Sequence, residues 1–208
     1  MDVSKPFRAL SPSVDLDVLV VLAGSTAPRS GREIARRAGR SKTGVQHVLE
    51  RLVDHGLVNR LDVGNASLYS LNREHLLTPA VEQMANARVE LIRRLQERIG
   101  SFGIPAAHAS LFGSAARGDG DVASDIDLLI VRPSAVDADD EIWRAQIDEL
   151  ADIVLRWSGN HAGIAEFSED ELPRLRDERP PVVEQVQRDA VDLAGEPARH
   201  VFATLAPR

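Results

Sequence analysis

Two aspartates one residue apart open an otherwise apolar run, Asp125-Ile126-Asp127-Leu128-Leu129-Ile130-Val131. On a β-strand Asp125 and Asp127 would point to the same face, because side chains alternate between the two faces. Two like charges on a buried strand repel each other and are costly to remove from water. A divalent cation would offset that cost, and Mg²⁺ is commonly held by carboxylates together with substrate phosphates. The pattern predicts a Mg²⁺ or Mn²⁺ site, and the alternative is a hairpin edge with solvated acids.

A glycine-serine pair precedes these acids, with ten residues between Ser114 and Asp125. Gly113 follows a short apolar segment and lets the backbone turn sharply and approach a ligand closely. Ser114 offers a hydroxyl and an amide at an expected helix start, where anions bind well. Arg117 adds a planar guanidinium that suits phosphate, and Ser124 directly precedes the acid pair. We therefore expect this stretch to bind phosphates beside the cation.

The combined motif resembles the nucleotidyltransferase superfamily that includes DNA polymerase beta. The pairs Gly113-Ser114 and Arg117-Gly118, followed by Ser124-Asp125-Ile126-Asp127, look like the minimal nucleotidyltransferase group, which includes antitoxins and antibiotic-modifying enzymes. The resemblance covers roughly residues 104–196. It implies an α/β domain with a mixed sheet that uses an NTP and a divalent cation. The implied reaction moves a nucleoside monophosphate to a hydroxyl acceptor, with Asp125 and Asp127 as catalytic metal ligands.

Members of this superfamily normally carry a third carboxylate on the strand after the next helix, where it completes a two-metal site and acts as general base. By the resemblance, that strand is 161–167, and its only acid is Glu166, which becomes the third catalytic candidate. The expected register places the family's acid nearer Gly163, and strand alternation puts Gly163 and Glu166 on opposite faces. Glu166 is therefore either the third ligand, through a bulge or a shift of one residue, or a surface glutamate.

Composition narrows the class of protein. The 208 residues allow one large or two small domains, and the absence of cysteine excludes disulfides and thiolate metal sites. No signal peptide is apparent and no apolar stretch approaches the length of a membrane span, so we expect a cytoplasmic protein without a membrane partner. The net charge of −7 is uneven, because residues 1–75 hold 11 Lys and Arg against 8 Asp and Glu. This third of the chain is the expected contact for a polyanion.

The pattern of this basic third is typical of a winged helix-turn-helix domain. Apolar residues at helical spacing predict three helices, at 14–23, 32–38 and 42–55. Two strands are expected to form the wing, at 57–61 and 67–71. The order helix, helix, tight turn, helix, hairpin resembles the winged-helix transcription regulators.

The exposed side of the third helix and the arginines near it would contact DNA. Recognition helices present their N-terminal residues to base edges, and phosphate contacts add affinity without sequence information. The candidate DNA-binding residues are Arg36, Arg40, Lys42, Thr43, Gln46, His47 and Arg60. Winged helices also serve as protein–protein and dimerisation modules, so a role without DNA is the alternative, and a homodimer fits both.

The expected fold is α+β in four parts: a loosely held tail at 1–13, the winged helix-turn-helix domain at 14–73, one linker helix at 74–103 and the nucleotidyltransferase-like domain at 104–208. In the last part a helix at 137–157 should follow the acid strand. Ser168 with Glu171 three residues later predicts a capping box at the next helix.

Three functions remain open at this point. The first is an enzyme that moves a nucleotide onto a protein or small-molecule hydroxyl, with the winged helix targeting or regulating it. The second is a DNA-binding regulator whose nucleotidyltransferase domain is a nucleotide sensor or is inactive. The third is an antitoxin that modifies or binds a toxin and represses its own promoter, which would use both domains.

Overall fold

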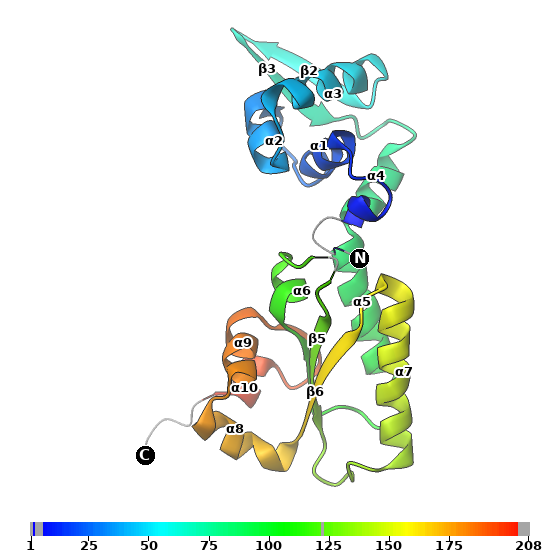
Figure 1. Cartoon of the computed structure of the whole chain (residues 1–208), viewed down its shortest axis with the longest axis vertical. Coiled ribbons are helices and arrows are strands. Elements are labelled where there is room, and N and C mark those ends of the chain that lie inside the picture. The colour runs from blue at the N-terminus through cyan, green and yellow to red at the C-terminus, as the bar shows by residue number, and fades with distance from the viewer. Residues whose placement is uncertain (1, 3–5, 122, 204–208) are drawn as a thin grey trace. The chain divides into compact units, whose positions relative to one another are not determined.

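The computed structural model describes residues 2, 6–121 and 123–203. The chain divides into two compact units, Lys5–Ala87 and Arg88–Arg208, the second including the first four residues. Each unit has hydrophobic core residues of its own, and Figure 1 labels many of their helices and strands. None of the helices in the described part of the chain is long and apolar enough to cross a membrane.

The N-terminal unit packs three helices against a small antiparallel sheet. The helices are α1 (Val14–Ala23), α2 (Gly31–Ala38) and α3 (Lys42–Asp54). The sheet has the strand order β1-β3-β2 and consists of β1 (Arg29–Ser30), β2 (Val58–Val63) and β3 (Ala66–Leu71). The predicted winged helix-turn-helix order is confirmed, and β1 is an additional strand that pairs with β3.

Local sequence explains where α2 and α3 begin and end. The Ser30 and Ser41 hydroxyls accept hydrogen bonds from the backbone N–H groups of Glu33 and Gly44, which caps each helix. Gly39 ends α2 with a φ of 65°, in the left-handed region that glycine adopts without strain. The core beneath the helices includes Val18, Ile34, Val45 and Leu49, all fully buried. This packing leaves the polar face of α3 toward solvent.

Part of the segment expected to be a loosely held tail is packed. Residues Pro6–Ala9 form a short 3-10 helix, η1, in which Phe7 is only 2% exposed. The helix η1 contacts α1 and α4. A buried aromatic side chain removes a large apolar area from water, so η1 is anchored to the N-terminal unit.

The segment 74–103 contains two helices rather than the single linker helix that its apolar stripe predicted. The first is α4 (Thr78–Ala85) and the second is α5 (Ala87–Gly100). Asn86 ends α4 with φ −93° and ψ 12°, outside the helical region. α4 buries Val81 in the core of the N-terminal unit, whereas α5 buries its stripe in the C-terminal unit. The break therefore coincides with the division between the units.

The C-terminal unit is built on a four-stranded mixed sheet with the order β6-β5-β4-β7. The strands are β4 (His108–Leu111), β5 (Ile126–Arg132), β6 (Ala162–Ser168) and β7 (Val191–Gly195). β4 is antiparallel to both β5 and β7, whereas β5 and β6 are parallel. The helix α7 (Glu141–Ser158) connects the parallel pair. The predicted mixed sheet is confirmed.

Helices cover both faces of this sheet (Figure 1). One face packs on α5 and α7, and the other packs on α8 (Leu172–Glu178), α9 (Pro181–Asp189) and α10 (Ala198–Val201). The side chains of β5 alternate between the two cores: Ile126, Leu128 and Ile130 enter the first, and Leu129 and Val131 enter the second. By the same alternation, Asp127 points to the second face.

Side-chain caps set the start of two further elements. α7 begins at Glu141, later than expected, because the Asp140 carboxylate accepts the backbone N–H groups of Ile142 and Trp143. The predicted capping box is present at η2 (Glu169–Glu171), where Ser168 and Glu171 bond reciprocally. These caps determine where the helices that follow β5 and β6 begin.

Candidate functional site

Asp125 and Asp127 lie at the start of β5 in different surroundings. Asp125 directly precedes the strand and is exposed, whereas Asp127 is half-buried. Burial raises the pKa of Asp127 above its ordinary value, and the negative charge of Asp125 raises it further, while Arg117 lowers it. Asp125 is therefore close enough to disfavour the charge of Asp127.

Asp127 lies between two glycines. A Cβ atom at Gly113 would overlap with Asp127 Oδ2, and a Cβ atom at Gly163 would lie 3.1 Å from Asp127 Oδ1. Gly113 also has a φ of 68°, which favours glycine. Gly163 is the direct partner of Asp127 in the register of β5 and β6. The carboxylate thus occupies a cradle formed by the turn after β4 and by the edge strand β6.

The glycine-serine pair opens α6 (Gly113–Arg117), as expected. Ser114 is half-buried, and a Cβ atom at Gly120 would come within 2.8 Å of its Oγ atom and 3.5 Å of Ser124 Cβ. The two serines therefore close around the backbone of Gly120. The Ser124 hydroxyl donates to Asp121 Oδ1 at 3.0 Å, and the Ser124 carbonyl accepts from Asn160 Nδ2 at 2.7 Å. The hydroxyl of Ser124 is thus already hydrogen-bonded within its own loop.

Arg117 is bound to two acids. Its Nε donates to Asp119 Oδ2 at 3.0 Å and its Nη1 donates to Asp189 Oδ2 at 2.7 Å. Hydrogen bonds from Arg188 and Arg117 hold the pKa of Asp189 at about 2. Arg117 therefore links α6 to α9, and a phosphate would have to compete with Asp119 and Asp189 for its guanidinium.

A residue that the sequence did not indicate, Arg88, anchors α6. Arg88 Nε donates to the carbonyl of Ala115 at 2.8 Å, and Nη2 donates to the carbonyl of Ala116. A cation bonded to the last carbonyls of a helix is favourable. Gly118 ends α6 with a φ of 75° and lies against Arg88, since a Cβ atom there would be 3.5 Å from Arg88 Nε. The partners of Arg88 are backbone carbonyls far along the chain, so no pattern in the sequence indicates these contacts.

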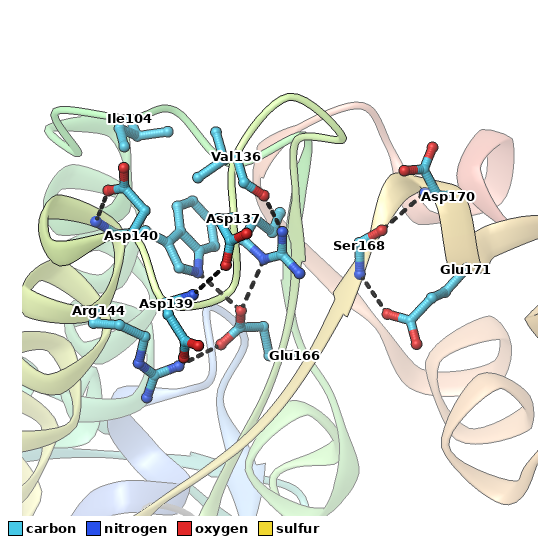
Figure 2. Close-up of polar contacts among 12 residues, drawn as sticks. Ile104, Val136, Asp137, Asp139, Asp140, Arg144, Glu166, Ser168, Asp170 and Glu171 are labelled. Atoms are coloured by element: carbon cyan, nitrogen blue, oxygen red, sulfur yellow. Dashed lines mark hydrogen bonds and ion pairs between the residues drawn. The ribbon is translucent and has the colours of Figure 1, made fainter.

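Glu166 lies outside the acid site, contrary to its candidate catalytic role. It pairs with Ile130, whose side chain enters the core beneath α5 and α7, so it faces away from Asp127. Figure 2 shows Glu166 with its hydrogen-bond partners. Its Oε1 accepts from Trp143 Nε1 at 2.9 Å and from Arg132 Nε at 3.2 Å, and its Oε2 accepts from Arg144 Nη1 at 2.9 Å. The β5–β6 register runs without a shift, which would have been needed to bring Glu166 in.

The carboxylates of Asp125 and Asp127 fit one hard cation whose remaining ligands come from a bound phosphate or water. Two carboxylates suit Mg²⁺, which usually keeps waters and substrate phosphates as its remaining ligands. Within residues 2, 6–121 and 123–203, no group of three or more His, Cys, Asp or Glu side chains is arranged to hold a metal ion. Asp125 and Asp127 would therefore hold an ion jointly with phosphate or water.

The N-terminal unit has an open groove along its recognition helix. The groove has a volume of about 530 Å³ and runs between α2, α3 and the wing strand β3. Its lining includes Arg32, Lys42, Thr43, Gln46, His47 and Tyr69. Four of the seven candidate DNA-binding residues thus lie together in one concave surface.

Tyr69 is a groove residue that sequence reasoning missed. It is buried on β3, and its hydroxyl accepts a hydrogen bond from Gln46 Nε2 at 3.4 Å. Gln46 Nε2 also donates to Glu50 Oε1 at 2.9 Å. The wing strand β3 therefore contacts the recognition helix α3 through Tyr69 and Gln46. The sequence alone does not indicate this contact, because the two residues are far apart along the chain.

The candidate basic residues differ in their partners. Arg40 Nε donates to Asp17 Oδ2 at 2.6 Å and Arg60 Nε donates to Asp62 Oδ1 at 2.9 Å. Arg36 and Lys42 have no acidic partner among the described residues. Both line a second concave region of about 520 Å³ beside the first. Among the candidate DNA-binding residues, Arg36 and Lys42 are therefore the two arginine or lysine side chains with least competition for a phosphate.

Comparison with known families agrees with this division. Residues 90–193, half of the chain, match the model of the nucleotidyltransferase domain. The chain belongs to the nucleotidyltransferase-domain family. Residues 13–72 match the model of the sugar-specific transcriptional regulator TrmB. The predicted fusion of a winged-helix DNA-binding domain to a nucleotidyltransferase domain is confirmed.

Two solved structures are similar to this nucleotidyltransferase-family chain over part of its length. ZitR from Lactococcus lactis is 22% identical with a TM-score of 0.33, covering 43% of this chain and 61% of that one. A MarR family transcriptional regulator from Silicibacter pomeroyi DSS-3 is 19% identical with a TM-score of 0.34, covering 44% and 65%. The chain thus spans less than two thirds of either protein. No curated protein matches the chain.

Proposed function

We propose that the nucleotidyltransferase domain binds an NTP through a divalent cation at Asp125 and Asp127 and transfers the nucleoside monophosphate to a hydroxyl acceptor. The placement of Asp127 between Gly113 and Gly163, with Asp125 beside it, carries this proposal. Burial and the neighbouring Asp125 raise the pKa of Asp127, which disfavours its charged form in the absence of a cation. A bound cation with attached phosphates would make that charge favourable.

The neighbouring residues would position the nucleotide. When bound, the cation supplies neutralisation of phosphate charge. Gly113 lets the backbone approach the phosphates, and the half-buried hydroxyl of Ser114 would donate to a phosphate oxygen. The acceptor oxygen would form a bond to the α-phosphorus in line with the bond that breaks. Pyrophosphate leaves with the electrons of that bond, and the hydroxyl proton passes to water.

The test compares the wild type with the double variant Asp125→Asn, Asp127→Asn. Binding of Mg²⁺ with each NTP is measured by calorimetry, and transfer of labelled nucleotide is followed with candidate proteins and small molecules. We expect binding and transfer to fall below detection in the double variant. Asp139→Asn is the matched control, because Asp139 is exposed and lies beyond the opposite end of β5. Unchanged binding in the double variant would exclude the proposed site.

We further propose that the winged-helix domain binds DNA through the groove along α3. The support is the groove itself and the absence of acidic partners for Arg36 and Lys42 within the described residues. Fluorescence anisotropy with labelled duplex DNA at low salt is the direct measurement. Absence of binding at low salt would leave the domain as a protein–protein module.

A second candidate is a DNA-binding regulator or antitoxin whose nucleotidyltransferase domain binds a nucleotide without turnover. The position of Glu166, turned toward α7 and saturated by three donors, favours it. Metal-dependent nucleotide binding without transfer or hydrolysis would support this candidate over the enzyme. An acceptor that becomes labelled would support the enzyme.

A further inference from the structure

The residue of β6 that faces Asp125 and Asp127 is a glycine and therefore has no side chain. Gly163 is the register partner of Asp127 on the parallel strand β6. A Cβ atom at Gly163 would lie 3.1 Å from Asp127 Oδ1 and 3.8 Å from Asp125 Cβ. A carboxylate at this position would therefore reach the same space as both aspartates.

The other acids around the site are bound elsewhere. Asp119 and Asp189 both accept hydrogen bonds from Arg117, and Asp121 accepts the hydroxyl of Ser124. Glu166 is on the opposite face of the sheet. In the part of the chain that the structure describes, no third carboxylate or imidazole completes a metal-binding group with Asp125 and Asp127.

A second ion needs protein ligands of its own. Two-metal sites hold their ions about 3.5–4 Å apart, so each ion stabilises one of the two oxygens of an in-line displacement. Mg²⁺ requires near-octahedral coordination and is held at least in part by carboxylates. Here Asp127 is enclosed by Gly113 and Gly163 and Asp125 is at the rim, which leaves the side of the site formed by β6 without a carboxylate.

We infer that Gly163 limits the nucleotidyltransferase domain to one divalent ion per bound nucleotide. The ion at the phosphates is retained, and the ion that would activate the acceptor oxygen is absent. Attack on the α-phosphorus is therefore slow, and the bound nucleotide is turned over slowly. This inference rests on the proposed nucleotide site at Asp125 and Asp127.

The same geometry predicts that a carboxylate at residue 163 would restore a second ion. Gly163 does not have a positive φ, so its backbone accepts an aspartate. The new Cβ atom would be tight against Asp127 Oδ1, which must move by a few tenths of an ångström. That atom is the end of a side chain, so the adjustment does not involve the backbone.

The experiment counts ions in the full-length protein. Mn²⁺ is titrated in the presence of the α,β-methylene analogues of ATP, GTP, CTP and UTP, and bound Mn²⁺ is followed by electron paramagnetic resonance. We expect one Mn²⁺ per nucleotide in the wild type and in Gly163→Ala. Gly163→Asp should bind two, with the broadened spectrum of spin-coupled ions. Its hydrolysis of the natural NTP should rise at least ~100-fold over wild type, the lower end of the range of general-base effects.

Each outcome decides a different point. Two ions in the wild type would overturn the inference, and one ion in a folded Gly163→Asp protein would overturn the assignment to Gly163. If Gly163→Asp does not fold, as judged by circular dichroism, Gly163→Glu provides the same carboxylate on a longer side chain. No Mn²⁺-dependent nucleotide binding in the wild type would overturn the proposed function itself, and this inference with it.

Discussion

The carboxylate of Glu166 illustrates how side-chain direction separates a catalytic role from a structural one. It receives hydrogen bonds from Trp143 and Arg144 on α7 and from Arg132 on β5. We predict that Glu166→Gln lowers the free energy of unfolding by about 1–3 kcal/mol, because charged donors lose their partner. Urea denaturation measures this loss, and Mn²⁺–nucleotide affinity should not change. Glu178→Gln, at an exposed position of α8, is the control. A normal stability with lost nucleotide affinity would contradict the structural role of Glu166.

In contrast to Glu166, Asp127 should be needed for nucleotide binding and should lower the stability of the metal-free fold. A carboxyl group with a raised pKa contributes stability at low pH that is lost as the pH rises through that pKa. Asp127→Asn is therefore expected to raise the melting temperature of the metal-free protein at pH 7, while lowering Mn²⁺–nucleotide affinity by more than ~10-fold. Thermal melts with and without Mn²⁺ and nucleotide measure both effects. A lower melting temperature in the metal-free variant would show that the charge stabilises the fold.

His108 is a buried titratable residue that predicts acid sensitivity. It is fully buried, with Nδ1 at 2.6 Å from the carbonyl of Glu196 and Nε2 at 2.9 Å from Ser110 Oγ. Burial lowers the pKa of His108, so the unfolded chain binds a proton that the folded chain does not. Stability should fall as the pH drops below about 6.5, by at most about 1.4 kcal/mol per pH unit. In His108→Gln, urea denaturation between pH 7 and pH 5 should show a smaller slope.

Among the helices and strands, features that depend on neighbouring residues were predicted better than features that depend on contacts between distant residues. Ser41 caps α3 as expected, and Ile126 and Leu128 enter a different core from Leu129 and Val131, as strand alternation predicted, because both features depend on neighbouring residues. Of the two alternatives left open for β6, the structure has the register with Gly163 opposite Asp127, so Glu166 is not placed as the third catalytic candidate. The helix break at Asn86 was not predicted, since the apolar stripe continues across it while its two halves enter different cores. Long-range polar contacts such as Arg88 with α6 have no periodic pattern to reveal them.

Arg88 provides a test at this scale, because it acts on the nucleotide site only through α6. Arg88→Met removes the donors to the carbonyls of Ala115 and Ala116 and should loosen the turn that carries Ser114. We expect Mn²⁺–nucleotide affinity to fall by about 3–10-fold, which is about 0.7–1.4 kcal/mol, the value of a typical hydrogen bond. Arg88→Lys should recover part of it. Arg93→Met, on an exposed position of the same helix, is the control; equal losses in both variants would point to α5 as a whole.

For the whole molecule, charge separates the two units. Residues 5–87 contain 11 Lys and Arg against 8 Asp and Glu, and the rest of the chain holds the acidic excess that makes the net charge −7. DNA affinity should therefore fall steeply with salt, as phosphate contacts release counterions. The variant Arg36→Ala, Lys42→Ala should lower the slope of log K against log salt by about 2. Anisotropy titrations at several salt concentrations measure it, with Arg174→Ala on α8 as control, and an unchanged slope would exclude these two cations.

The placement of residue 163 on a border strand has a consequence for how this protein can change. In the sheet that the structure describes, β6 has a neighbour on one side only, so a replacement there disturbs few partners. Every glycine codon becomes an aspartate or glutamate codon through one base change. A single base change would thus supply the carboxylate that the inferred one-ion site lacks. Selection for nucleotide transfer from a mutagenised library should recover that substitution early.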